Sequence, residues 1–213
     1  MRILGIDPGS RLLGYGIVEV VGNKIQHVAH GTLRLASTGG KQTTPLEDRL
    51  LSIYEGLTAV IFEHHPVAMA VEKVFFAKNA VSALKLGQAR GATILTGKIH
   101  NLSIVEYSAS EVKQAVVGHG GADKEQVARM VTILTGQKDF DTFDASDGLA
   151  LAICHAHTAK TMGGHSAGYA AALQAASGRR GKKSGSLADA LGITLEQTQG
   201  NRRLDLSKAK TKT

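Results

Sequence analysis

The chain has 213 residues, of which 43% are hydrophobic, so it is long enough to bury a substantial core. Its one cysteine, Cys154, excludes an internal disulfide framework, fits a reducing cytoplasm and is interpreted as a small buried residue on a helix. No stretch approaches the roughly 18 uninterrupted apolar residues of a membrane span, and the opening residues lack a long apolar run, so we expect neither a membrane anchor nor a signal peptide.

The excess positive charge lies in the last quarter of the chain. Residues 1–159 contain 15 Lys/Arg and 15 Asp/Glu, whereas residues 160–213 contain 10 Lys/Arg and 3 Asp/Glu and therefore carry the whole net charge of +7. Such asymmetry is typical of a tail that binds a polyanion such as nucleic acid. We predict one domain over residues 1–160 and a basic, flexible extension over residues 161–213.

The N-terminal residues predict three sequential antiparallel strands. Arg2–Asp7 is a short apolar run closed by Asp-Pro-Gly, which indicates a buried strand that ends in a turn. Leu12–Val21 and Lys24–Leu35 are rich in Val, Ile and Leu, and the intervening Gly22-Asn23 favours a tight hairpin turn.

From residue 44 onward, predicted strands and helices alternate. A helix is expected to start at Thr44-Pro45, with Thr44 as its N-cap and Pro45 at its first position. The alternation implies parallel strands joined by crossover helices, and therefore an α/β fold. The remaining predicted elements are strands at Val67–Val71 and Leu102–Tyr107, and helices at Lys78–Asn101, Ser108–Val117, Asp123–Leu134 and Asp144–His157.

Acidic residues stand at the ends of two predicted strands and at the start of the last helix. Asp7 and Glu72 each close an apolar strand, and strand ends are where sites form in open α/β sheets. Asp144 and Asp147 are three residues apart, so on a helix they share a face and repel each other. If the two strands are neighbours and the helix crosses them, the carboxylates need divalent cations, and Mg²⁺ prefers such oxygen ligands. Two such ions clamp a phosphoryl displacement.

Each acid also has a simpler explanation when it is taken alone. Asp144 is suited to cap its helix, with Asp147 favoured in the first turn by the helix dipole. Asp7 fits an ordinary Asp-Pro turn, and Glu72 has Lys73 and Lys78 as possible partners. A zinc site at Cys154 is not expected, because His155 and His157 are two residues apart on a helix and point in different directions.

Four segments carry a resemblance to a known family. They are, in chain order, GIDPGSRLLGYGIVE, VEKVFFAKNAVSALKLGQARG, VKQAVVGHGGADKEQV and DASDGLALAICH. Together they resemble the RuvC family of bacterial Holliday junction resolvases, from Met1 to about His157. The resemblance implies an RNase H-like fold, a five-stranded mixed sheet flanked by helices. It further implies a homodimer with two Mg²⁺ ions per active site, replaceable by Mn²⁺. Such a dimer nicks a four-way DNA junction symmetrically during recombination and repair, together with the branch-migration proteins RuvA and RuvB.

The resemblance also implies roles for individual residues. The aromatic side chain that inserts at the junction centre falls on Phe75, which stands beside Phe76, and Arg11 is a candidate phosphate contact. Gly148 stands where the family pattern predicts Ala, a departure that weakens helix propensity by up to about 1 kcal/mol but removes no ligand. The acidic ligands fall on Asp7, Glu72, Asp144 and Asp147, and the lysines at the scissile phosphate on Lys113 and Lys124.

Two other functions compete with this one. A sugar-kinase or actin-like phosphotransferase also ends its first strand in an Asp-x-Gly loop, here Asp7-Pro8-Gly9. That class needs a second loop and a second lobe, for which the chain is too short. A junction-binding protein without catalysis is the other alternative, and the presence of the full acidic set argues against it.

Overall fold

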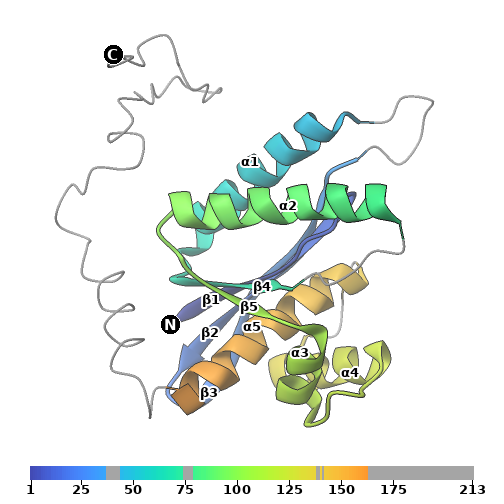
Figure 1. The fold of residues 1–213 in the computed structure, drawn as a ribbon. Helices are drawn as coiled ribbons and strands as arrows, with labels where there is room; N and C mark the ends of the chain where they lie inside the picture. The colour runs from blue at the N-terminus through green and yellow to red at the C-terminus, as the bar shows by residue number, and fades with distance from the viewer. Residues whose placement is uncertain (37–43, 74–78, 138–139, 141, 163–213) are drawn as a thin grey trace, which may run out of the picture. The chain divides into compact units, whose positions relative to one another are not determined.

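The computed structural model describes residues 1–36, 44–73, 79–137, 140 and 142–162, which form a mixed five-stranded sheet with helices on both faces (Figure 1). Phe75 and residues 163–213 lie outside the described residues. Among the helices in the described ranges, none combines the length and the apolar character that crossing a membrane requires.

The sheet has the predicted mixture of antiparallel and parallel strands. Its order is β3-β2-β1-β4-β5; β1, β2 and β3 pair antiparallel, whereas β4 and β5 run parallel to β1. Gly22, at φ 57°, and Asn23 form the tight turn between β2 and β3. The strands are β1 (Arg2–Asp7), β2 (Leu12–Val21), β3 (Lys24–Arg34), β4 (Ala68–Glu72) and β5 (Ser103–Tyr107).

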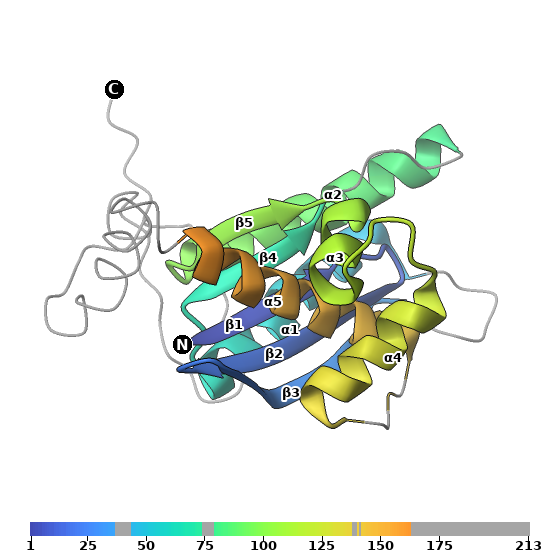
Figure 2. The same cartoon turned by 90° about the horizontal axis from the view of Figure 1, so that it is seen from below.

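Helices form a layer on each face of the sheet. On one face lie α1 (Leu46–His64) and α2 (Ala80–Ile99). The opposite face is crossed by α5 (Phe143–Met162), with α3 (Ala109–Val117) and α4 (Lys124–Thr135) beside it (Figure 2). Each layer has its own hydrophobic core, because alternate residues of the central strands point to opposite faces.

The observed ends of the helices can be compared with the ends predicted from local sequence. The helices predicted from Ser108 and Asp123 are confirmed, and each starts one residue later, because Ser108 and Asp123 act as N-caps in capping boxes with Glu111 and Gln126. The expectation for Thr44 is wrong: Pro45 occupies the N-cap position of α1, without a side-chain capping bond. The last helix extends to Met162 rather than ending at His157, because nothing in HTAKTM breaks a helix.

The helix α5 lies so close to β1 and β2 that side chains do not fit between the backbones. A Cβ atom on Gly5 would lie 2.1 Å from the carbonyl oxygen of Gly148, and one on Gly16 would lie 2.4 Å from the amide nitrogen of Leu149. A Cβ on Gly148 itself would lie 2.6 Å from the carbonyl carbon of Tyr15. The departure from the family pattern at Gly148 therefore has a structural reason, which is close packing against β2.

Candidate active site

The register of the sheet places Asp7 and Glu72 next to each other. β1 and β4 are parallel neighbours with Ile6 opposite Val71, so the acids that follow occupy adjacent strand ends. Gly5 and Ala70, two residues earlier, both face the α5 layer. Because side chains alternate along a strand, Asp7 and Glu72 face that layer as well.

The helix α5 brings Asp144 and Asp147 to the same edge. A Cβ on Gly14 would lie 1.9 Å from the carbonyl oxygen of Asp144, so the start of α5 rests directly on the strand residue that pairs with Asp7. The hydroxyl of Thr142 accepts a hydrogen bond from the amide of Ala145 (3.4 Å), which is the pattern of an N-cap. Thr142, not Asp144, therefore caps α5, and the simpler explanation of Asp144 as a capping residue is wrong.

The acids interact electrostatically across the edge of the sheet. Burial raises the pKa of Asp7 to about 8, helped by a hydrogen bond and charge repulsion from Glu72 and by repulsion from Asp147 and Asp144. Burial also raises the pKa of Asp147, although Lys124 opposes this shift. The carboxyl groups of Glu72, Asp144 and Asp147 are therefore all close enough to disfavour the charge of Asp7.

The chemistry of this set fits a hard divalent cation. The donors are carboxylate oxygens, the ligands that Mg²⁺ takes together with water and phosphate. Within the described residues, no three Asp, Glu, His or Cys side chains are arranged in the geometry of a metal site. Burial, together with repulsion from the other three acids, raises the pKa of Asp7, which indicates that the neighbouring side chains do not fully compensate its negative charge. A cation would supply that compensation.

The two candidate lysines differ in their relation to the acids. The ammonium of Lys124, the first residue of α4, lies 3.5 Å from a carboxylate oxygen of Asp147, and its side chain is 76% exposed. Lys113 is half-buried on α3, and the described structure contains no ion pair between it and any of the four acids. The structure thus brings Lys124 into the acidic cluster but does not do so for Lys113.

The remaining predicted DNA contacts are less defined. Arg11 is exposed in the connection between β1 and β2, where its carbonyl accepts a hydrogen bond from the amide of Leu35 (2.9 Å). Phe75, predicted as the inserted aromatic, lies outside the described residues.

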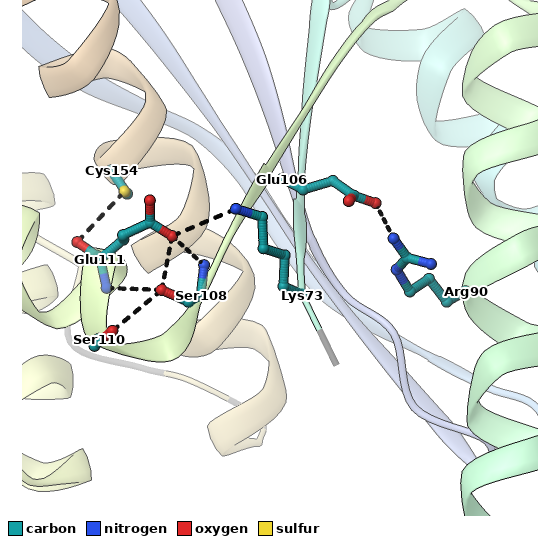
Figure 3. Close-up of polar contacts among 7 residues, drawn as sticks. All are labelled: Lys73, Arg90, Glu106, Ser108, Ser110, Glu111 and Cys154. Atoms are coloured by element: carbon teal, nitrogen blue, oxygen red, sulfur yellow. Dashed lines mark hydrogen bonds and ion pairs between the residues drawn. The ribbon is translucent and has the colours of Figure 1, made fainter. Parts of the chain in front are cut away.

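Polar contacts join the C-terminal ends of β4 and β5 to α3 and α2 (Figure 3). The amide of Lys73 donates to the carbonyl of Tyr107 (2.8 Å), and its ammonium lies 3.7 Å from a carboxylate oxygen of Glu111 on α3. On the other side of β5, Arg90 of α2 pairs with Glu106. Lys73 is thus paired with Glu111, so the simpler explanation that pairs Glu72 with Lys73 is wrong. Lys78, the other suggested partner of Glu72, lies outside the described residues.

The buried groups of α5 behave as structural residues. The His155 ring bonds the Tyr107 hydroxyl (2.7 Å), whereas Nδ1 of His157 lies 2.8 Å from the carbonyl of Ala115, so the two rings point apart as expected. Burial raises the pKa of the Cys154 thiol to about 12. The thiol donates a weak bond to the carbonyl of Glu111, which fits the interpretation as a small buried residue.

Sequence reasoning missed one residue beside the acids. Phe143, the first residue of α5, is 66% exposed although it directly precedes Asp144. The sequence does indicate this position, since a large aromatic residue stands among acids at the start of the helix. The apolar residues in the rest of the helix made Phe143 look like one more core residue.

The sheet order and the acids at its edge define an α/β protein of the RNase H-like nuclease class. The sequence profile described as crossover junction endodeoxyribonuclease RuvC matches residues 3–155, and the chain belongs to the RuvC family. It is accordingly an endodeoxyribonuclease of the class that resolves Holliday junctions, and this class depends on a metal ion.

Relatives and solved structures are similar over the same part of the chain. RuvC of Geobacter sulfurreducens is 55% identical over 159 residues, which are 75% of this chain and 94% of that protein. RuvC of Syntrophotalea carbinolica is 52% identical over 157 residues, 74% of this chain and 94% of that protein. A structure of T. thermophilus RuvC in complex with a Holliday junction substrate is 34% identical, with a TM-score of 0.68 over 76% of this chain and 96% of that one.

Proposed function

We propose that this chain hydrolyses phosphodiester bonds in four-way junctions with a site built from Asp7, Glu72, Asp144 and Asp147. The carrying observation is that, beyond the effect of burial, Glu72, Asp144 and Asp147 all raise the pKa of Asp7, although the four acids come from three separate segments of the chain: β1, β4 and α5. The acids are proposed to hold two Mg²⁺ ions, for which Mn²⁺ substitutes. When bound, such ions activate a water molecule and stabilise the leaving oxygen.

The residues of the chain prepare the site for that chemistry. Asp7 and Glu72 share a hydrogen bond at adjacent strand ends, which keeps their oxygens directed at the same space. Lys124 offsets part of the charge of Asp147, and its exposed ammonium is proposed to contact an oxygen of the scissile phosphate. The same role is proposed for Lys113 on the strength of the family pattern.

A cleavage assay separates this function from non-catalytic junction binding. A four-way junction labelled on each strand is incubated with the full chain, with and without Mg²⁺. We expect paired nicks at symmetric positions with the metal and binding without nicks after chelation. Binding that leaves all four strands intact in the presence of Mg²⁺ and Mn²⁺ would favour the non-catalytic alternative.

The exposed face of α2 is the proposed homodimer interface. Val81, Leu84, Leu95 and Ile99 are exposed by 57%, 70%, 56% and 41%, and they follow one stripe along the helix. A Cβ on Gly91, which lies within that stripe, would meet no atom within 4 Å, so another helix has room to approach. A junction has two-fold symmetry, and symmetric nicks require two identical sites, which an isologous dimer supplies.

Further contacts are proposed from the sequence. Phe75 is proposed to insert at the junction centre and Arg11 to contact phosphate. Partnership with RuvA and RuvB is proposed from the family pattern. A cytoplasmic location is proposed because the chain has a single cysteine. The basic residues 161–213 are proposed to add non-specific DNA affinity.

Deleting residues 166–213 tests the role of the basic extension. Each phosphate that the extension neutralises adds about 0.9 to the magnitude of the slope of log K against log salt concentration. We therefore expect the truncated chain to have a flatter slope and to retain cleavage at saturating protein. An unchanged slope would show that the extension is not a DNA-binding arm.

A further inference from the structure

The start of α5 presents an aromatic ring beside the acidic cluster. Phe143 is 66% exposed, more than Phe62 at 52%, and within the described part of the chain these two are the phenylalanines among the exposed large hydrophobic residues. Phe62 packs its ring edge-to-face against His100. A phenylalanine side chain has a large apolar area, and leaving it in water forgoes the stabilisation of burial.

Phe143 lies on the same face of its helix as an acid of the proposed site. Phe143 and Asp147 are four residues apart, so they lie on the same face of α5, one turn apart. The ammonium of Lys124 reaches Asp147 on that face, at 3.5 Å. The first turn of α5 is held in place, because Thr142 caps the helix and its hydroxyl lies 2.6 Å from the hydroxyl of Thr32 on β3. This face of α5 thus carries a carboxylate and an aromatic ring, and Lys124 of α4 brings a cation to the carboxylate.

We propose that the Phe143 ring stacks on the base of a nucleotide that flanks the scissile phosphate. Aromatic side chains accept any base as a stacking partner, and they do so where cationic groups hold the DNA backbone. The stacking would fix the register of the strand over the acids and make cleavage depend on the presence of a base at that flanking position, whatever its identity. The inference rests on the proposed function of the acidic site, because it uses that site to locate the scissile phosphate.

The test combines a variant of the protein with a change in the DNA. Junctions are prepared with an abasic residue on the 5′ or the 3′ side of the cut phosphodiester, and KM and kcat are measured with Mg²⁺. With the unchanged protein, we expect loss of the base on one side to raise KM about tenfold. With Phe143→Ala, KM for the intact junction should already be raised about tenfold, and loss of that base should add nothing further. Phe143→Trp should behave like the unchanged protein.

Ile133→Ala is the matched control. Ile133 is 65% exposed on α4, nine residues after Lys124 and hence on the opposite side of that helix. This variant should retain the full sensitivity to the missing base, and both alanine variants should keep the unfolding midpoint of the unchanged protein. The proposal is overturned if the unchanged protein is indifferent to both abasic positions, or if Phe143→Ala remains as sensitive to them as the unchanged protein. Neither result touches the proposed function, whose failure would appear as undiminished cleavage by Asp144→Asn.

Discussion

The helices α2 and α5 have the same length of 20 residues and a similar content of glycine and alanine, yet α5 is largely buried whereas α2 exposes one face to solvent. On α5, the glycine at position 148 meets backbone atoms of β2, and most residues from Ala145 to Ala156 are buried. On α2, a Cβ on Gly87 or Gly91 would meet no atom within 4 Å, and large apolar side chains face solvent.

Small residues in a helix do not by themselves identify the element that packs against it. They permit the close approach of another backbone, but they do not specify which one. In α5 the approaching backbone belongs to β1 and β2 of the same chain, which also contribute glycines at the contact: Gly5, Gly14 and Gly16. The described part of the chain provides no such partner for the exposed face of α2, and we propose that a second copy does.

The largest expected effect comes from filling the contact between α5 and β2. Gly16→Ala would place a Cβ 2.4 Å from the backbone nitrogen of Leu149, so the helix must move. We expect the free energy of unfolding to fall by about 3 kcal/mol, measured by urea denaturation. The matched change on α2, Gly91→Ala, should leave the monomer as stable or raise its stability by up to about 1 kcal/mol through helix propensity. Equal effects of the two substitutions would remove the distinction between the helices.

A second large effect concerns the buried histidine of α5. Burial lowers the pKa of His155 from 6.5 to about 4, so between these pH values the unfolded chain binds a proton that the folded chain does not. Its contribution to the free energy of unfolding therefore falls as pH drops from about 6.5 to 4, by about 3 kcal/mol in total, and is constant above that range.

The effect is measured as the difference in pH dependence between the unchanged protein and His155→Phe. The variant should lose less stability on acidification. Tyr107→Phe, which removes the hydroxyl bonded to the ring but keeps the histidine, should retain the acid sensitivity. Identical pH profiles for His155→Phe and the unchanged protein would show that His155 is not held neutral by burial.

A smaller effect is expected from charging the exposed face of α2. Leu84 is 70% exposed, so Leu84→Glu should cost the monomer little. Within a dimer interface, however, the same change buries an unpaired charge, and we expect dimerisation to weaken by about 2 kcal/mol or more. Sedimentation over a range of concentrations measures the shift. Lys85→Glu, beside it on an exposed position, controls for the added negative charge. An unaltered dimer in the Leu84 variant would place the interface elsewhere.

The sheet and the ends of several helices could be predicted from the sequence because their signals are local. Asp-Pro-Gly after β1, Gly22-Asn23 between β2 and β3, and the capping residues Ser108 and Asp123 each determine structure within a few positions. Thr44 misled, because a threonine before a proline is only one of several ways to begin a helix. The sequence also predicts that Asp7 and Glu72 stand at the ends of two strands, which are adjacent because β1 pairs with β4.

The contacts between distant segments could not be predicted in the same way. The close approach of α5 to Gly5 and Gly16 depends on how a helix and two strands pack, and isolated glycines in strands equally suggest a bulge. The pairing of Lys124 with Asp147 joins two helices that no sequence spacing relates. Only the family pattern placed Lys124 near the site. The exposure of Phe143 is likewise a property of the assembled fold.

The proposed site unites four acids from β1, β4 and α5 in one metal-dependent reaction. The direct measurement is cleavage and binding of one labelled junction by Asp7→Asn, Glu72→Gln, Asp144→Asn and Asp147→Asn, each with Mg²⁺. We predict that every variant loses cleavage by at least about a thousandfold while it retains junction binding, because binding depends on basic residues and shape. Asp123→Asn, which changes an acid that caps α4, should still cleave. Normal nicking by any one of the four variants would contradict the claim and remove that acid from the site.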